Sequence, residues 1–257
     1  MSERLFLYID ILGFSELVAD DVAMAEIFSR IDKLNVHTDR DFKTIVFSDT
    51  ILVYGDGLWL NHKSQAVMWL SEFAQDLFHH FINIDRHFRA YLTIGNFVHE
   101  TKNHFQAFYG QALVDCYNKE KEIKSTGLYM DNKLIGYSDI FHVTPYDDDC
   151  SFVHVMQALD SISFDYKAYP IDPILVDSTG MDEFVAPFFV YLKNIWKHFH
   201  DEKLQEGVRL KYKNTWKMIE SRHPGLLKVL VENDFNPVCV SKMDWTVAMG
   251  RAEDPNW

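Results

Sequence analysis

Hydrophobic positions follow two different periods in the first part of the chain. Residues 5–11 are almost continuously apolar apart from Asp10, which predicts a buried central strand. Residues 16–34 repeat their apolar side chains at helical spacing, and the Asp20-Asp21 pair divides this stretch into two helices. The pattern therefore opens with a strand followed by helices.

A second β-rich stretch follows at residues 42–54, where Val, Ile, Thr and Phe dominate. It predicts a β-hairpin whose two-residue turn carries Asp49. The later pattern predicts helices at residues 62–84 and 111–124 and strands at residues 88–99 and 128–130. Strands and helices interleave around antiparallel neighbours, which predicts an α+β, ferredoxin-like sheet with helices over residues 1–145.

The composition changes near Pro145, so residues 146–257 are predicted to form a C-terminal α/β extension of unknown role. The elements expected in it are a hairpin at residues 152–159 and 162–166, a strand at 171–176, helices at 184–199 and 203–221, a short helix after Pro224 and a strand near Val238.

The net charge and the composition of the chain exclude some classes of binding partner. The net charge of −13 argues against nucleic acid and anionic membranes, which require basic patches. The three cysteines form neither a disulfide framework nor a zinc motif. With no signal-peptide pattern and no long apolar run, we expect a soluble cytoplasmic protein.

Asp10 and Asp49 carry the candidate chemistry. A carboxylate in an apolar strand is costly to bury unless it is paired or binds a cation. A strand end and a neighbouring hairpin turn bring two such groups to one edge of a sheet. Two carboxylates and a backbone carbonyl suit Mg²⁺ or Mn²⁺ carrying a nucleoside triphosphate, which points to phosphoryl-transfer chemistry.

Other motifs give weaker signals. His198 and His200 fall on different faces of their helix, so they are not expected to share a ligand. The acidic run 147–149 lacks the glycine and distal glutamate of an EF-hand and is interpreted as a solvated loop. The sequence contains no P-loop, G-x-G-x-x-G or G-x-S-x-G pattern.

Four segments between residue 5 and about residue 130 resemble, in order and spacing, the class III nucleotidyl cyclases. They are Tyr8-Ile-Asp-Ile-Leu-Gly-Phe-Ser15, Ser48-Asp49, Arg89-Ala-Tyr-Leu-Thr-Ile-Gly95 and Gly110-Gln-Ala-Leu-Val-Asp-Cys-Tyr-Asn-Lys-Glu120. In that family the first two segments supply the metal aspartates, the third is an Arg-containing strand, and the fourth leads from a glycine into a helix.

Three positions of this sequence differ from the pattern of the purine-specific members of that family. Ile45 stands where purine cyclases keep a base-reading lysine. Val114 and Asn118, or Asp115 and Lys119 with a one-residue shift, stand where the transition-state Asn and Arg belong. The sequence is more similar to the pyrimidine cyclases of the bacterial Pycsar antiphage systems.

That resemblance implies cyclisation of UTP to cUMP, or of CTP to cCMP, with release of pyrophosphate. It implies a homodimer with composite sites, and a separate effector that receives the cyclic nucleotide. Asp10, Asp49 and the Ile11 carbonyl would hold two Mn²⁺ or Mg²⁺ ions.

The remaining site residues are assigned by their position relative to those motifs. Lys119, Lys121 and Arg89 are the candidates for meeting the triphosphate, although Arg89 is equally explained as a structural strand residue. The candidates for contacting the rest of the substrate are Phe14, Ile45, Phe47, Asn96 and Asn118.

Two other functional classes stay open. One is a non-catalytic cyclase-like module for nucleotide binding or dimerisation. The other is a polymerase-like or diguanylate-type enzyme with two metals, against which the missing Gly-Gly-Asp/Glu-Glu-Phe hairpin argues.

Overall fold

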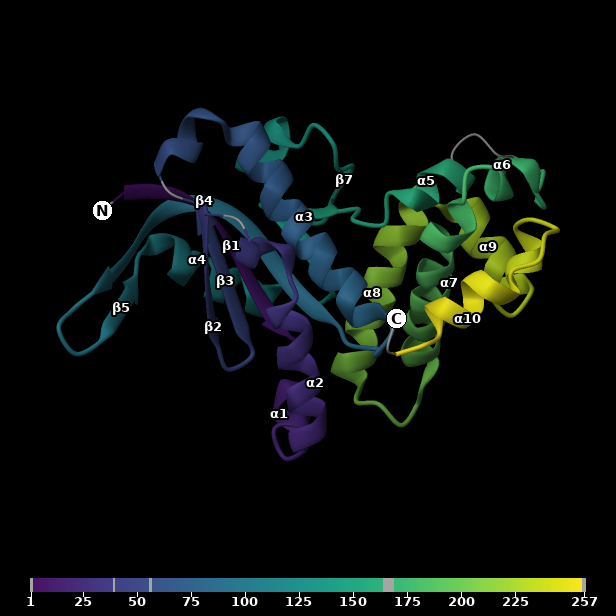
Figure 1. Ribbon diagram of the computed structural model, residues 1–257, viewed down its shortest axis with the longest axis horizontal. Coiled ribbons are helices and arrows are strands. Elements are labelled where there is room, and N and C mark those ends of the chain that lie inside the picture. Colours follow the sequence, from purple (N-terminus) through teal and green to yellow (C-terminus); the bar gives the residue numbers. More distant parts are fainter. Residues whose placement is uncertain (1, 39, 56, 164–168, 256–257) are drawn as a thin grey trace. The chain divides into compact units, whose positions relative to one another are not determined.

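A computed structural model describes the chain except for residues 1, 39, 56, 164–168 and 256–257 (Figure 1). The chain divides into two compact units. The first comprises Met1–Phe78 and His87–Val155, and the second comprises His79–Arg86 and Met156–Trp257. None of the described helices combines the length and hydropathy that a membrane span requires.

The elements of the first unit alternate between strands and helices. In chain order they are β1 (Ser2–Ile11), α1 (Phe14–Leu17), α2 (Asp21–Asp32), η1 (Asn35–Thr38), β2 (Phe42–Phe47), β3 (Thr50–Gly55), η2 (Gly57–Asn61), α3 (Lys63–Ile82), β4 (Phe88–Thr101), β5 (Gln106–Tyr109), α4 (Gln111–Glu122), β6 (Gly127–Asp131), η3 (Asn132–Tyr137), β7 (Val143–Pro145) and β8 (Cys150–Val153).

The strands form one sheet in the order β2-β3-β1-β4-β6-β8-β7, with β5 paired to β4 beside it. Every pairing is antiparallel except that of β4 with β6. The predicted α+β architecture is therefore confirmed. The unit runs past residue 145, the predicted boundary, because β8 pairs with both β6 and β7 of the same sheet.

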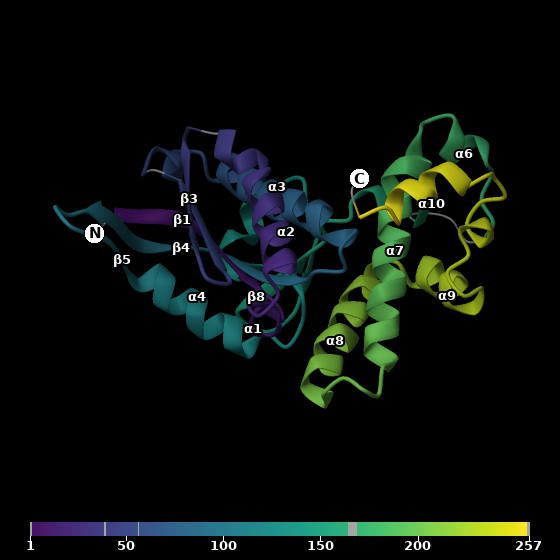
Figure 2. The ribbon, with the colours of Figure 1, turned by 60° about the horizontal axis from the view of Figure 1, so that its bottom comes forward.

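The two faces of this sheet differ in polarity. Helices α2 and α3 lie on one face and α4 lies on the other (Figures 1 and 2). Because side chains alternate along a strand, Leu7 and Ile9 of β1 point to one face and Tyr8 and Asp10 to the other. Asp10 shares its face with α4, since both contact Arg89. The α4 face is thus the polar one.

The hairpin forms as predicted. Phe47 of β2 pairs with Thr50 of β3, which leaves Ser48 and Asp49 as the two-residue turn. Ser48 has a positive φ of 56°, as the tight turns that match the twist of a hairpin require at this position.

The predicted break between the first two helices is also confirmed. The Asp20 carboxylate accepts hydrogen bonds from the backbone N–H groups of Val22 and Ala23, at 3.0 and 3.1 Å. Asp20 is therefore the N-cap of α2, and the helix cannot be continuous with α1.

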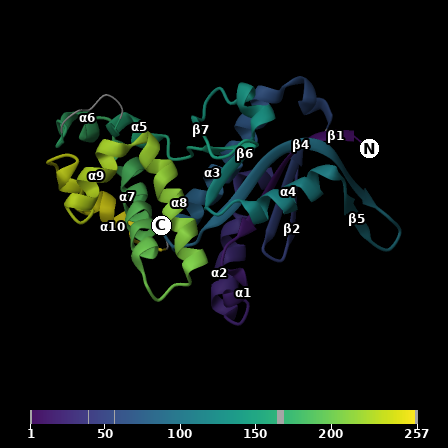
Figure 3. The same cartoon turned by 180° about the vertical axis from the view of Figure 1, so that it is seen from behind.

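The described elements of the second unit are helices (Figure 3). The strand that the predicted α/β extension of residues 146–257 does contain, β8, belongs to the sheet of the first unit. The elements of the second unit are α5 (Ala158–Ser163), α6 (Ile174–Asp177), α7 (Met181–His200), α8 (Glu206–Arg222), α9 (Pro224–Glu232), η4 (Pro237–Cys239) and α10 (Thr246–Ala252). The three helices predicted after residue 180 are confirmed as α7, α8 and α9.

The strands predicted in this region are present only in part among the described residues, since Phe152 and Val153 of the first one lie in β8. Residues 158–163 form α5, and residues 164–166 of that prediction lie outside the described residues. Of the strand predicted at 171–176, Ile171 makes an isolated bridge to Ser241. Val238 lies in a 3₁₀ turn. Short apolar runs do not distinguish a strand from a helical turn, and packing of α5 and α6 against α7 selects the helix.

Gly110 begins α4 at a position that excludes a side chain. Its φ is 150°, and a Cβ there would stand 2.7 Å from the Phe97 Cα. We expect Gly110→Ala to lower the free energy of unfolding by about 2–3 kcal/mol, measured by urea denaturation. The matched Gly136→Ala, which meets no atom within 4 Å, should change it by less than about 0.5 kcal/mol. Equal effects of the two changes would contradict this account.

Candidate active site

The structure places Asp10 and Asp49 at the same edge of the sheet. Asp10 is opposite Thr50 in the pairing of β1 with β3, and the Ile11 N–H donates to the Asp49 carbonyl at 2.9 Å. The Asp10 side chain is 18% exposed and Asp49 is half-buried. Both residues can therefore be reached from solvent at this edge.

Arg89 lies directly opposite Asp10 in the pairing of β1 with β4. Its Nη2 is 3.3 Å from the Asp10 carboxylate, and its Nη1 donates to the Ile123 carbonyl at 2.7 Å. A second ion pair joins the guanidinium to Glu120 of α4. Asp10, Arg89 and Glu120 form what we call the arginine cluster.

The arginine cluster is enclosed, since Arg89 is only 5% exposed. Burial lowers the pKa of Arg89, and the adjacent Asp10 carboxylate opposes that shift. A guanidinium stays charged in proteins, so the two carboxylates neutralise a buried cation. Arg89 is thus a buried strand residue whose guanidinium contacts the Asp10 carboxylate through Oδ2.

Glu120 was not among the residues predicted for the site. The signal for it was in the helical period of α4, where Ala112, Cys116, Lys119 and Ile123 at its end are buried. Glu120 lies one turn after Cys116 and so shares the face that packs on the sheet.

Lys119 belongs to a different group of charges. Its Nζ lies 3.0 Å from Asp147 and 3.4 Å from both Asp149 and Glu122, and the residue is 8% exposed. Burial alone would lower the pKa of Lys119, but the hydrogen bond to Asp147 and the surrounding carboxylates raise it overall. In this structure its charge is already matched by acidic side chains of its own chain.

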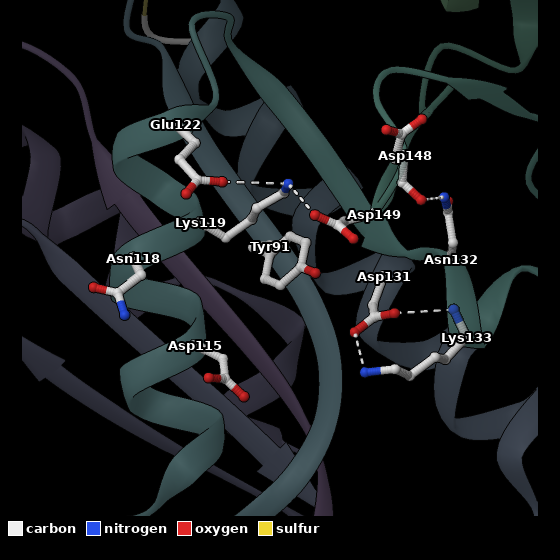
Figure 4. A pocket seen from close by; sticks show the side chains of 10 residues that line it. All are labelled: Tyr91, Asp115, Asn118, Lys119, Glu122, Asp131, Asn132, Lys133, Asp148 and Asp149. Carbon is white, nitrogen blue, oxygen red and sulfur yellow. Dashed lines mark hydrogen bonds and ion pairs between the residues drawn. The ribbon is translucent and has the colours of Figure 1, made fainter.

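The other predicted residues of α4 face outward. Asn118 is exposed and lines a cavity with Lys119 (Figure 4). Lys121 is exposed as well, with its Nζ 3.7 Å from the centroid of the Tyr117 ring. Phe14 is buried at the start of α1 and packs edge-on against Phe28, with ring centroids 6.4 Å apart.

The residues predicted for the base pocket are spread along the sheet. Phe47 is 77% exposed beside the hairpin turn, and Ile45 is half-buried in β2. Asn96 is exposed near the far end of β4, opposite Glu3. At about 3.3 Å per residue, it stands roughly 23 Å along β4 from Arg89. Within one chain, Ile45, Phe47 and Asn96 therefore do not form one pocket next to Asp10.

Comparisons with known proteins give structural neighbours only. The sequence matches no protein-family model and no curated protein. Among solved structures, a bacterial light-regulated adenylyl cyclase has 9% identity and a TM-score of 0.45, with 60% of this chain and 91% of that chain covered. The guanylate cyclase domain of RhGC from Catenaria anguillulae, in complex with GTP, has 11% identity and a TM-score of 0.42, with 60% and 96% covered.

A third neighbour is the adenylyl cyclase CyaB from P. aeruginosa, at 8% identity and a TM-score of 0.40, with 58% of this chain and 91% of that chain covered. At such low sequence identities and TM-scores, the activities of these neighbours cannot be assigned to this chain. An assignment of function has to rest on the residues of the chain itself.

The donor set at the sheet edge suits a hard divalent cation. Asp10, Asp49 and the Ile11 carbonyl offer oxygen atoms only, which Mg²⁺ and Mn²⁺ prefer to nitrogen or sulfur. Arg89 contacts Asp10 through Oδ2. The Asp10 side chain is 18% exposed, and the three residues supply oxygen ligands only, so the residues present fit such a metal.

Loss of Arg89 should destabilise the first unit strongly. We expect Arg89→Met to lower the free energy of unfolding by about 3 kcal/mol or more, because it removes the buried cation that pairs with both Asp10 and Glu120. The matched Arg251→Met breaks an exposed pair with Glu183 and should cost less than about 1 kcal/mol. Urea denaturation of both variants measures the difference, and equal losses would refute the arginine cluster.

The ion pair of Lys119 with Asp147 should make the free energy of unfolding depend on pH at acidic pH. Burial raises the pKa of Asp147, but hydrogen bonds from Lys119 and two backbone N–H groups lower it overall. A lowered pKa stabilises the fold above the unfolded value near 3.9, and the gain is lost as the pH falls below about 4.

Asp147→Asn should therefore lower the free energy of unfolding at pH 7 by up to about 1 kcal/mol, a small effect because the carboxylate is partly exposed. The difference from the unmodified protein should shrink below about pH 4 in urea denaturation at several pH values. The neighbouring Asp148→Asn is the control, and its curve should stay parallel to that of the unmodified protein.

Proposed function

We propose that this protein is a nucleotidyl cyclase that converts UTP into 3′,5′-cyclic UMP and pyrophosphate. The observation that carries the proposal is the position of Asp10 and Asp49 at one edge of the sheet, joined by the bond from the Ile11 N–H to the Asp49 carbonyl. Both residues belong to segments whose order and spacing resemble the class III cyclases.

In the proposed reaction the ribose 3′-oxygen attacks the α-phosphorus. A new P–O bond forms as the bond to the bridging oxygen of the β-phosphate breaks, and pyrophosphate leaves. Divalent ions held by Asp10, Asp49 and the Ile11 carbonyl would lower the pKa of the 3′-hydroxyl and neutralise charge on the leaving group. Arg89 positions Asp10 for this task through its contact at Oδ2.

A homodimer with composite sites is part of the proposal. Asn118 and Lys121 are exposed on α4, and neither lies in the arginine cluster of its own chain. Lys119 and Arg89 already have acidic partners. Lys121 of a second copy is therefore the cation that we assign to the triphosphate.

The pyrimidine preference rests on Ile45, which stands where purine cyclases keep a base-reading lysine. The aliphatic side chain of Ile45 can neither donate a hydrogen bond to a purine base nor accept one from it. CTP is the second candidate substrate. As in the antiphage systems that the sequence resembles, the cyclic nucleotide would be a second messenger for a separate effector in the cytoplasm.

Incubation with each of the four ribonucleoside triphosphates and Mn²⁺, followed by mass spectrometry, tests the proposal. We expect cUMP from UTP. Formation of cCMP alone would transfer the assignment to CTP, whereas cAMP or cGMP alone would overturn the pyrimidine preference. Linear dinucleotides would indicate a polymerase-like enzyme, and nucleotide binding without product would indicate a non-catalytic module.

Two conservative variants test the metal aspartates. Asp10→Asn and Asp49→Asn keep the shape of the side chain and remove its charge, so each should lower kcat by about 100-fold or more. The matched Asp32→Asn changes an exposed aspartate of α2 and should leave kcat unchanged. Circular dichroism of each variant establishes that it is folded. Full activity of either site variant would refute the metal role.

A further inference from the structure

A cavity of about 270 Å³ lies within the second unit. Its walls come from α7 and α10, which pack against each other (Figure 1), from the last residues of α3 and from the turn after α9. Asp10 and Asp49 belong to the first unit, so the proposed cyclase reaction does not use this cavity. It is a separate candidate for ligand binding.

The inner wall of this cavity is apolar. It is formed by Ile82 of α3, Phe189 of α7, Met249 of α10 and Phe235 from the turn after α9. Ile82 and Phe189 are 2% and 1% exposed, so their side chains belong to the core of the unit. An apolar group that enters the cavity leaves water and contacts this wall, which is favourable.

Three polar side chains of the lining have no partner of their own. Lys193 and Asn194 are neighbours on α7, and Glu253 follows Met249 by one helical turn at the end of α10. Among the residues that the structure describes, none of these three side chains makes a hydrogen bond or an ion pair. The fourth polar residue, Asn83, already donates to the Asp254 carbonyl at 3.3 Å.

Lys193 and Glu253 place opposite charges on different walls of the cavity, one from α7 and one from the end of α10. They do not form an ion pair with each other. A ligand with a single charge pairs with one of them only. A ligand that has both a carboxylate and an ammonium group pairs with both through charge-assisted hydrogen bonds.

The backbone at Phe235 is an independent sign of a binding site. The N–H of Phe235 donates to the Leu230 carbonyl at 2.7 Å, which closes the turn that ends α9 and explains the positive φ of Asp234. That turn requires one left-handed residue, whereas Phe235 has a φ of 58° as well, which is rare for a bulky side chain. Such strain is found at ligand sites, and the Phe235 side chain lines this cavity.

The size and the polar groups of the cavity exclude other classes of ligand. Its volume is below the lower limit of about 300 Å³ for typical ligand pockets, so it suits a molecule smaller than a nucleotide. A divalent metal ion requires several oxygen ligands, and Glu253 is the one carboxylate of the described lining. An inorganic anion is attracted by Lys193 but repelled by Glu253.

We propose that this cavity binds a free α-amino acid with an apolar side chain. The carboxylate of the ligand pairs with Lys193 and accepts a hydrogen bond from the Asn194 amide, and its ammonium group pairs with Glu253. The apolar side chain of the ligand lies against Phe189 and Met249. The second unit is then a part of the protein that binds an amino acid.

Isothermal titration calorimetry on the full chain tests the proposal, with L-leucine as the probe. Two matched analogues each lack one charge, since isoamylamine lacks the carboxylate of leucine and isocaproate lacks its ammonium group. We expect leucine to bind at least about tenfold more tightly than either analogue, because each analogue loses a charge-assisted hydrogen bond. Glycine keeps both charges without the apolar side chain and should also bind at least about tenfold more weakly than leucine.

Two variants separate the two charges. Lys193→Met should weaken leucine binding by about tenfold and leave isoamylamine binding unchanged, because isoamylamine has no carboxylate. Glu253→Gln should weaken leucine binding by about tenfold and leave isocaproate binding unchanged, because isocaproate has no ammonium group. The controls Lys197→Met and Glu202→Gln make the same substitutions at exposed positions outside the cavity and should not change leucine binding.

Several results overturn the proposal. These are the absence of leucine binding, equal binding of leucine and either analogue, or equal leucine binding by the cavity variants and the control variants. The titration contains no nucleotide, so its outcome does not depend on the cyclase assignment.

Discussion

The buried guanidinium of Arg89 is the constraint on which the first unit depends. A charge enclosed among strands and a helix is tolerated only if opposite charges and hydrogen bonds surround it. Asp10 from β1, Glu120 from α4 and the Ile123 carbonyl meet that need. The arginine cluster therefore fixes both the position of α4 on the sheet and the direction of the Asp10 carboxylate.

The contrast between the two faces of the sheet follows from the same cluster. One face carries apolar side chains such as Leu7 and Ile9, which are buried completely. The α4 face carries Asp10, Arg89 and Tyr91 at alternate positions of β1 and β4. Packing uses the first face, and Asp10 with the rest of the arginine cluster lies on the second.

Helix α4 serves two separate groups of charges because of its period. Glu120 points to the arginine cluster, whereas Asp115 and Lys119 point to the cavity beside β6 and β8. Lys119 shows why a lysine near a candidate site need not act on the substrate. Three carboxylates of its own chain surround its ammonium group, and its hydrogen bonds to Asp147 and Asp149 outweigh burial and raise its pKa.

The sequence by itself determined the helices α2, α3 and α4, the strands β1, β2, β3, β4 and β6, and the meeting of Asp10 with Asp49, whereas β5 and β7 were not predicted. The predicted elements and this meeting depend on local rules, namely the strand and helix periods, the Asp20 cap and the two-residue hairpin turn. Only the tertiary structure decided the partner of Arg89, the acidic surroundings of Lys119 and the helical form of residues 158–163. Ion pairs between residues distant in the chain leave no periodic signal, and short apolar runs take the conformation that their packing neighbours impose.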